Sequence, residues 1–409
     1  MKKILDGIVV LDLTRFFSGP QSTLFLAGMG AEVIKIDDPN GGDPTAFAPP
    51  FAGPLGVSFE AQTEQDMGVP YLKRARGKKS ITLNLKSEEG REIFLRLARQ
   101  ADVIVENFSA GVTRRLGIDY ETVAAANPRI VYCSLTGYGA TGPDRDAKAY
   151  DLMVQAAVGL VSLTGQEDAP PVKAATPLSD AIAGAMAATG IVAALLHRER
   201  SGEGQQIDVA MADCLFSLLF DEPIDCYDRL GVSSRQANRA IRFSPFNVYP
   251  ASDGWVAIGV ATNEQWAGLV QIIGADIPAG WTDHMRVGWR IANNAAIDEW
   301  ITGWTRRHTR RQLVDALAEA RVPASSVRTI DEVMRWSQLR SRGMIEPLWN
   351  PLAGARMAAE APGFPIKFAR TPASYGPAPV PGFHSDEVLS RFAQVSAEKL
   401  ADLRQRGIV

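Results

Sequence analysis

The chain has 409 residues, of which 46% are hydrophobic and 22% charged, and its formal net charge at pH 7 is -3. This is the composition of an ordinary soluble globular protein, without the excess of Lys and Arg that is typical of nucleic-acid-binding proteins. The three cysteines and four histidines show no CxxC or HxxxH spacing, which argues against a disulfide framework and a structural zinc site. We therefore expect a small-molecule enzyme of a reducing compartment, with neither nucleic acid nor metal among its partners.

Neither the N-terminus nor the most apolar segment indicates export or membrane insertion. Asp6 and Asp12 interrupt the N-terminal apolar run, which we interpret as a first strand beginning near Ile8 rather than as a signal peptide. The uncharged run 181–196 is shorter than the roughly 20 residues needed to cross a bilayer, so it predicts a buried helix. These observations predict a cytoplasmic protein that has no membrane partner.

Along the first half of the chain, short apolar segments alternate with helical patterns. Strands are predicted at 8–13, 31–36, 80–85, 103–105, 130–135 and 206–211, and helical segments at 21–30, 87–101, 109–117, 181–197 and 212–230. This order, together with the nearly continuous apolar character of the strands, predicts an α/β fold with a parallel, doubly wound sheet.

The pattern changes after Gly231. The segments that follow predict a polar and basic linker, a compact α+β unit, a long Pro- and Gly-rich surface-crossing segment (347–381) and two amphipathic helices in 385–406. We therefore expect a large domain at 1–230, a linker at 231–245, a small α+β domain at 246–330, and a linker and C-terminal segment at 331–409.

A glycine-rich sequence, Gly137–Gly142, follows the predicted strand 130–135 with GxGxxG spacing. A dinucleotide site requires a helix to begin immediately after such a turn, so that its N-terminus receives the pyrophosphate. Here Pro143, Asp144 and Asp146 follow, and no strand with an acidic end comes at the expected distance. We favour a glycine-rich turn with another purpose, and its contribution to a site stays open.

Five cations occupy seven positions of the sequence KRARGKK at 73–79. Such a run is commonly a solvated loop. It also leads into a predicted strand, beyond which Lys86 lies at the carboxyl end, where ligands of open α/β sheets bind. A phosphate-bearing ligand would fit such a rim, so both interpretations stand.

Asp180 lies at the start of the predicted small-residue helix, after a proline-containing loop. Ser179 or Asp180 would serve as an N-cap there. Alternatively, Asp180 would be a carboxylate nucleophile at a helix N-terminus that a bulky ligand can approach. Tyr150 and Asp151 open another predicted helix in a similar way.

Taken together, the segments resemble the class III coenzyme A transferases, the family of formyl-CoA and carnitine CoA-transferases. The matching segments, in chain order, are LDLTRFFSGP (11–20), GAEVIKID (30–37), RGKKSITLNLK (76–86), ADVIVENFSAGVTRRLG (101–117), NPRIVYCSLTGYGATGP (127–143), YDLMVQAAVGL (150–160), LSDAIAGAMAATGIVAAL (178–195) and RSGEGQQIDVAMAD (200–213). The C-terminal part resembles the family more loosely, through GWVAIGVATNEQW, RVPASSV and PGFHSDEVL.

The resemblance implies a Rossmann-like large domain that the C-terminal residues complete, a small domain, and an interlocked homodimer. The family's nucleophilic aspartate corresponds to Asp180. The family's CoA-lining positions correspond to Phe17, Ser18, Leu83, Asn84, Leu85, Lys86, Asn107, Phe108, Ser109, Arg115, Ala147, Lys148, Ala149 and Tyr150. CoA would then be the ligand of the basic rim formed by 73–79, Lys86, Arg115 and Lys148. The resemblance implies acyl-CoA and a carboxylic acid as substrates and no bound prosthetic group.

The chain departs from the oxalate-using branch of the family in three places. That branch has Arg at the position of Asp38, Gln at that of Phe17, and a glycine-rich loop that has no match between residues 240 and 251. These departures argue against oxalate or formate specificity. Small dicarboxylic, aryl or carnitine-like acids all occur as family substrates.

The resemblance implies transfer through a mixed anhydride and an aspartyl-CoA thioester, both formed on Asp180. The main alternative is an α-methylacyl-CoA racemase, which shares the fold and the aspartate but has His at the position of Tyr150. Two-base proton exchange needs a group that cycles its proton near neutral pH, which Tyr does poorly, so transfer is favoured. The intact nucleophile position argues against a third possibility, a non-catalytic acyl-CoA-binding protein.

Overall fold

The computed structural model describes residues 3–274 and 277–409, and these form two compact units. The first comprises Met1–Gly159, Ala174–Glu222 and Ser337–Val409, and the second comprises Leu160–Lys173 and Pro223–Trp336. The sequence predicts residues 160–173 to lie in the large domain, but they belong to the second unit. Arg235 holds them there, because its guanidinium donates to the carbonyl oxygens of Ser162, Gln166 and Ala169.

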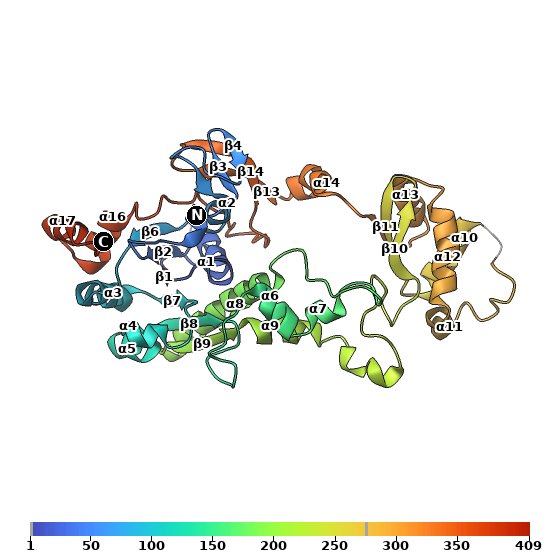
Figure 1. Cartoon of the computed structure of the whole chain (residues 1–409), viewed down its shortest axis with the longest axis horizontal. Helices are drawn as coiled ribbons and strands as arrows, with labels where there is room; N and C mark the ends of the chain where they lie inside the picture. Colours follow the sequence, from blue (N-terminus) through green and yellow to red (C-terminus); the bar gives the residue numbers. More distant parts are fainter. Residues whose placement is uncertain (1–2, 275–276) are drawn as a thin grey trace. The chain divides into compact units, whose positions relative to one another are not determined.

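Among the described residues, six parallel strands form the central sheet of the first unit, in the order β6-β2-β1-β7-β8-β9 (Figure 1). The strands are β1 (Val9–Asp12), β2 (Glu32–Asp37), β6 (Lys79–Thr82), β7 (Val103–Glu106), β8 (Val131–Thr136) and β9 (Gln205–Ala210). β1 pairs with both β2 and β7, and Leu11 lies beside Ile34 on one side and Ile104 on the other. The strand order therefore reverses between β1 and β7, and their carboxyl ends are where an open α/β sheet binds its ligand. The predicted α/β class with a parallel sheet is confirmed.

Helices pack on both faces of this sheet. On one face, α3 (Glu88–Gln100), α5 (Tyr120–Ala126), α16 (Ser385–Ala393) and α17 (Ala397–Gln405) share an apolar core with the strands. Val388, Leu389 and Phe392 of α16 lie in that core, so the C-terminal segment is part of the first unit. On the other face, α1 (Ser18–Gly28) packs against β1, β2 and β7.

Helix α8 (Leu178–Ser201) carries the candidate nucleophile near its start and packs against α1, β8 and β9. Its buried side is formed by small residues such as Ala183, Gly184 and Ala187, which lets the two helices approach closely. The helix has 24 residues and is long and apolar enough to cross a membrane by length and composition. One side of it lies against α1 and the sheet of the first unit, but only 44% of its apolar window is buried, so the predicted buried helix is buried on one side only.

The first unit also contains two small antiparallel sheets and several short helices. The strands are β3 (Phe51–Gly53), β4 (Gly56–Ser58), β5 (Met67–Gly68), β13 (Ile345–Asn350) and β14 (Ala355–Pro362), and the remaining helices are η1 (Pro44–Phe47), α2 (Val69–Arg74), α4 (Val112–Leu116), α6 (Asp151–Ala157), α9 (Met211–Leu219) and α15 (Ser337–Ser341). The hairpin β13–β14 lies inside the predicted surface-crossing segment 347–381. It forms because the buried Asn350 side chain donates to the carbonyl oxygens of Ala52 and Gln65, at 2.9 and 2.7 Å, and anchors it to the β3 region.

The second unit is an α+β structure around a three-stranded antiparallel sheet (Figure 1). Its elements are β10 (Phe246–Ala251), β11 (Gly254–Gly259), β12 (Ala324–Ser326), α7 (Leu160–Leu163), η2 (Ile224–Cys226), η3 (Asp228–Leu230), α10 (Asn263–Ile273), α11 (Val287–Ala292), α12 (Asn294–Thr305), α13 (Arg310–Glu319) and α14 (Ile330–Arg335). Trp266, Ile297 and Leu313 pack in its own core, as expected of a separate folding unit.

Candidate active site

A cavity of about 430 Å³ lies in the first unit at the carboxyl edge of the parallel sheet. The segments that follow β1, β7 and β8 line it, together with a loop before α6 and the starts of α8 and α9. Its wall is formed by Phe16, Ser18, Asn107, Phe108, Ser109, Ala110, Leu135, Thr136, Gly137, Arg145, Asp146, Ala147, Lys148, Ala149, Tyr150, Asp180 and Met211. The cavity thus lies where the strand order reverses.

The carboxylate of Asp180 is the nucleophile candidate in this wall, and it is not used to cap its own helix. Asp151, at the start of α6, caps α8 instead: its Oδ1 accepts hydrogen bonds from the Ser179 backbone N–H (2.9 Å) and hydroxyl (2.6 Å). Ser18 lies in the same wall as Asp180, and its hydroxyl and backbone N–H lower the pKa of the Asp180 carboxyl. Asp151 therefore performs the capping function that the sequence leaves open for Asp180.

The environment of Asp180 raises the pKa of its carboxyl toward neutral pH. Burial, the largest cause, raises its pKa to about 6, and the negative charge of Asp151 acts in the same direction. The hydrogen bonds from Ser18 and the positive charge of Arg74 act against this rise. A carboxylate with such a pKa is mostly ionised at pH 7 and is a better nucleophile than one with an ordinary pKa.

The turn between β1 and α1 brings Phe16 and Ser18 into the cavity wall. Phe16 has φ 69°, a left-handed conformation that is uncommon for an aromatic residue. The Asn107 side chain holds the turn from β7: it accepts from the Arg15 N–H (2.9 Å) and donates to the Arg15 carbonyl (2.8 Å). The ring of Phe16 meets that of Tyr150 edge to face, with centroids 6.2 Å apart.

The glycine-rich turn after β8 forms part of the cavity wall through Gly137. A Cβ atom at Gly137 would lie 2.2 Å from the Cβ of Ala149, so only glycine lets the segment 147–150 pack against the end of β8. The N–H of Ala140 donates to Asp208, which fixes the turn on β9. No helix begins directly after it, so a pyrophosphate would find no helix N-terminus there.

The structure brings many of the predicted site residues together in one wall. These are Ser18, Asn107, Phe108, Ser109, Ala147, Lys148, Ala149, Tyr150 and Asp180. The sequence misses Phe16, whose positive φ leaves no signal in the residue type. It also misses Arg145 and Met211, although Met211 is the last residue of the predicted strand 206–211 and the rule that ligands bind at carboxyl ends could have found it.

Six predicted CoA-site residues lie outside this wall, and their contact with CoA stays a prediction. They are Phe17, Leu83, Asn84, Leu85, Lys86 and Arg115. The Phe17 ring lies under the Arg74 guanidinium, 4.6 Å from its centroid, and the Leu83 side chain is buried in the sheet core. Residues 83–86 follow β6, which is the edge strand farthest from β8 and β9, and Lys86 is exposed beside Asp38.

The basic run at 73–79 does not form the solvent-exposed phosphate rim that the sequence suggests. Arg76 is buried and binds Glu346 and the Pro362 carbonyl, because the returning chain brings an acceptor to it. Lys78 is fully buried and pairs with Asp12, and Lys79 pairs with Glu32 and Glu387. Among the residues that the structure describes, no group of three or more His, Cys, Asp or Glu side chains is arranged to hold a metal ion.

Comparison with known proteins identifies the family. The model of CoA-transferase family III matches residues 5–385. The chain belongs to CoA-transferase family III. It is 34% identical over 399 residues to the succinate–glutarate CoA-transferase of Agrobacterium fabrum, which covers 96% of this chain and 97% of the relative. It is 36% identical over 392 residues to the succinyl-CoA:mesaconate CoA-transferase of Haloarcula marismortui, which covers 94% and 95%.

A solved structure of this family has the same fold. The crystal structure of a CAIB/BAIF family protein from Brucella suis matches 96% of this chain and 100% of its own chain, with a TM-score of 0.81 and 31% identity. These matches confirm the resemblance that the ordered segments indicate. The protein is therefore an enzyme, a family III CoA-transferase.

Proposed function

We propose that this CoA-transferase moves CoA from an acyl-CoA thioester to a carboxylic acid, with Asp180 as the covalent nucleophile. The observation that carries the proposal is the state of the Asp180 carboxylate. It lies in the cavity at the carboxyl edge of the sheet, Asp151 relieves it of the capping function, and its pKa of about 6 leaves it mostly ionised at pH 7.

The reaction consists of two acyl exchanges on Asp180. The carboxylate attacks the donor thioester carbonyl, the C–S bond breaks, and CoA leaves as a thiolate while a mixed anhydride forms. The thiolate then attacks the Asp180 carbonyl, which releases the donor acid as a carboxylate and leaves an aspartyl-CoA thioester. An acceptor carboxylate repeats both steps in reverse order, so Asp180 is regenerated and no proton is consumed overall.

The residues around Asp180 support these steps in distinct ways. Ser18 lies beside Asp180 in the wall and would donate a hydrogen bond to the oxygen of the tetrahedral adduct that forms there. Phe16, Phe108 and Tyr150 supply apolar surface in the wall, which limits the access of water to the anhydride. These contacts favour transfer over simple hydrolysis of the thioester.

We further propose small dicarboxylic acids as substrates. The two curated relatives are named for succinate, glutarate and mesaconate, all of which carry two carboxylates. In this chain, Arg145 and Lys148 lie in the cavity wall, where a second carboxylate or a CoA phosphate would find a cation.

The wall of the cavity does not favour the racemase alternative. Residue 150 is Tyr, and the four histidines, all of them described, lie outside the wall. Asp151, next to it, already accepts from Ser179 and Gln155. The described wall therefore contains no histidine that could act as the second base of a racemase.

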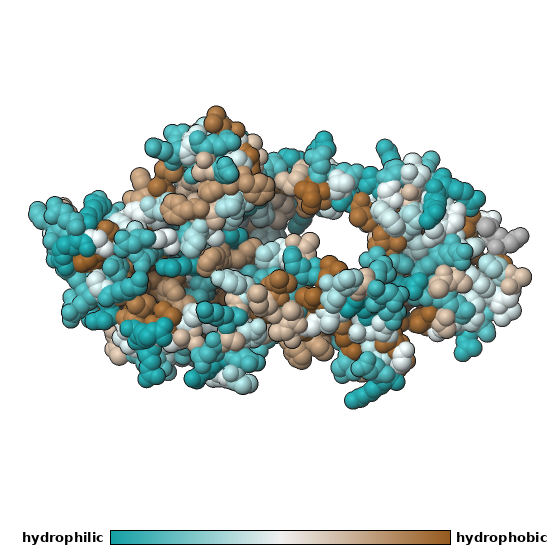
Figure 2. All heavy atoms as spheres, in the orientation of Figure 1, coloured by the Kyte–Doolittle hydropathy of each residue, from teal (hydrophilic) through white to brown (hydrophobic). Residues whose placement is uncertain are grey.

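We also propose that the protein is a homodimer, interlocked as the family resemblance implies. Helices α6, α8 and α9 leave large apolar side chains exposed on the first unit, and apolar residues gather over α6 and α9 in Figure 2. This α6–α8–α9 face comprises Leu152, Met153, Met186, Val192, Leu196, Phe216, Leu218 and Phe220. Exposed apolar side chains on neighbouring helices of this kind are typical of a subunit interface.

The test of the nucleophile compares Asp180→Asn with Glu121→Gln, a carboxylate-to-amide change on the exposed side of α5. We expect D180N to lower kcat by at least about a thousandfold and E121Q to leave it unchanged. Wild type incubated with acyl-CoA and hydroxylamine should yield a hydroxamate on the peptide that contains residue 180, detected by mass spectrometry. Full transfer by D180N would overturn the proposal. A panel of acyl-CoA donors and dicarboxylic acids, read by CoA-thioester mass spectrometry, identifies the substrates.

A further inference from the structure

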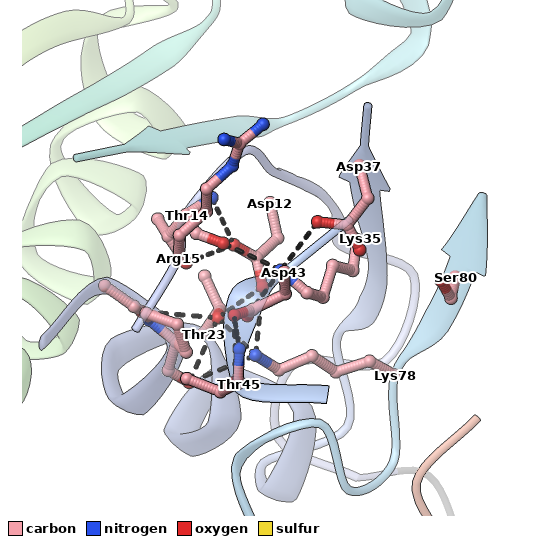
Figure 3. A network of polar contacts seen from close by, with 12 residues as sticks. Asp12, Thr14, Arg15, Thr23, Lys35, Asp37, Asp43, Thr45, Lys78 and Ser80 are labelled. Atoms are coloured by element: carbon pink, nitrogen blue, oxygen red, sulfur yellow. Dashed lines mark hydrogen bonds and ion pairs between the residues drawn. The ribbon is translucent and has the colours of Figure 1, made fainter. Parts of the chain in front are cut away.

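A fully buried charge network lies directly behind the β1–α1 turn (Figure 3). Lys78, which precedes β6, pairs with Asp12 at the end of β1 at 2.9 Å, and both side chains are 0% exposed. Lys35 of β2 pairs with Asp37 and Asp43, each at 3.1 Å. Burying such charges is costly, and an apolar core would stabilise the fold at least as well, so the network calls for another function.

Three of the buried charges, Asp12, Lys35 and Lys78, also bind the backbone at one end of the β1–α1 turn. At the start of the turn, Asp12 accepts from the Thr14 N–H (3.0 Å), and Lys35 donates to the Thr14 carbonyl (2.7 Å). At its end, Lys78 donates to the Pro20 carbonyl (3.0 Å) and to the Thr23 hydroxyl (2.7 Å). The network therefore fixes both ends of the segment that contains Ser18.

The turn needs such anchors because its conformation is strained. Phe16 has φ 69°, a region of backbone conformation in which a non-glycine residue is strained. The first turn of α1 also packs tightly on the end of β1, since a Cβ at Gly19 would lie 2.4 Å from the Thr14 Cβ. Without the charges behind it, the turn would relax toward an unstrained path.

The anchored turn delivers Ser18 to the nucleophile. Ser18 lies in the cavity wall with Asp180, and its carbonyl approaches α8 so closely that a Cβ at Gly184, one helical turn after Asp180, would lie 2.7 Å from it. We propose that Asp12 and Lys78 are positioning residues of the transfer reaction: their buried pair holds the strained turn so that Ser18 donates to Asp180. This inference rests on the proposed nucleophile and adds the structural element that tunes it.

The charged groups that face Asp180 predict the direction of the effect. Asp151 of α6 raises the pKa of Asp180, Arg74 at the end of α2 lowers it, and Ser18 of α1 lowers it through hydrogen bonds. Arg145, Asp146 and Lys148 face the same cavity from the loop before α6. A variant that removes the buried pair as a whole changes no net charge, so its effect on Asp180 passes through Ser18.

The experiment is a cycle of variants built from D12N/K78M and S18A. We expect each to move the midpoint of the acid limb of the kcat/KM profile to higher pH by about one unit. Activity at pH 6 would then fall about fivefold relative to activity at pH 8. In the S18A background, D12N/K78M should add no further shift. The control is D102N/R198M, which removes another ion pair (2.9 Å) at the amino end of β7 and should leave the acid limb in place.

A readout that does not depend on turnover separates this inference from the nucleophile assignment. The 13C signal of the Asp180 carboxyl, assigned by its loss in D180N, should titrate at a higher pH in D12N/K78M than in wild type. A uniform loss of activity with an unchanged acid limb and an unchanged 13C midpoint would overturn the positioning role and leave the nucleophile untouched. Full activity of D180N would instead overturn the nucleophile. If D12N/K78M does not fold, Thr23→Val is tested instead, because it removes a single hydroxyl from the network. An acid limb at higher pH in T23V would support the positioning role, and an unchanged acid limb would overturn it.

Discussion

The carboxylate of Asp180 costs the folded state free energy because it is ionised where burial favours the neutral acid. Its pKa of about 6 lies above the ordinary value of 3.8, so the native state keeps a proton over a pH range in which the unfolded chain has lost it. The resulting stabilisation is present below pH 3.8 and is lost as the pH rises through 6. An amide at this position avoids the loss.

We therefore expect D180N to be more stable than wild type at pH 8, by about 1–3 kcal/mol. The difference should shrink toward zero near pH 4, where the wild-type carboxyl is protonated as well. Urea denaturation followed by far-UV circular dichroism at both pH values measures it. Equal stability at pH 8 would mean that Asp180 is solvated like an exposed carboxylate.

Asp151 supplies a second test at the residue scale, because its effect on the pKa of Asp180 is opposite to that of Ser18. Its negative charge raises the pKa of Asp180, and its Oδ1 caps α8. In D151N an amide oxygen can still accept from Ser179 while the charge is gone. We expect the acid limb of kcat/KM to move to lower pH by a few tenths of a unit or more. In D151A the cap is lost too, which should cost about 0.5–2 kcal/mol. An acid limb that stays in place in D151N would show that the charge of Asp151 does not act on the nucleophile.

At the scale of elements, the closeness of α1 and α8 determines where Asp180, the proposed nucleophile, lies. Gly184 faces the Ser18 carbonyl and the Gln21 side chain, whereas Gly190, further along α8, has only an ordinary contact of 3.5 Å with Ile207. In G184A the added Cβ would clash with the backbone carbonyl of Ser18. The substitution should therefore lower activity at least tenfold and destabilise the fold by about 1–3 kcal/mol. G190A should be neutral or stabilise by up to about 1 kcal/mol, because Ala favours the helix. Steady-state kinetics and thermal melts of both variants compare them, and equal behaviour would contradict the role given to this contact.

The elements that the sequence predicts well are those whose pattern is local. In the parallel sheet β1, β7 and β8 are mostly apolar runs, and α8 is rich in small apolar residues, so these elements are visible in the residue types alone. The hairpin β13–β14 is hidden because Pro347 and the glycines around it favour a loop, and its anchor at Asn350 depends on β3, far away in the sequence. The basic run is misjudged for the same reason, since Asp12 and Glu346, which neutralise Lys78 and Arg76, come from distant segments.

Residue identity limits the prediction of the site in a similar way. Asp180, Asn107 and Tyr150 are found because the family resemblance marks their positions. Phe16 is missed because a left-handed φ has no signature in a phenylalanine. That Asp151 caps the helix of Asp180 requires α6 and α8 to meet in space, which spacing along the chain does not reveal.

For the molecule as a whole, the question is what covers the α6–α8–α9 face. α8 has the length and apolar composition of a membrane-spanning helix, but one side of it is buried against the parallel sheet and α1. The exposed side continues onto α9, where Phe216 and Phe220 stack with ring centroids 4.5 Å apart. A second copy of the chain would bury this face without unfolding α8 from the sheet, whereas insertion into a bilayer would require that separation.

We therefore expect L196D/F216D to dissociate the protein into monomers, because it places two charges where the proposed interface excludes water. The control is F383D, an equally drastic change at a 74% exposed phenylalanine beside β6, at the opposite edge of the sheet. Analytical ultracentrifugation of the three proteins gives their masses directly. F383D should sediment like wild type as a dimer. A wild-type monomer, or a dimer that survives L196D/F216D, would show that a second copy does not cover this face. Because the face begins at Leu152, one residue after the Asp151 cap, the monomer should also lose activity as α6 loosens.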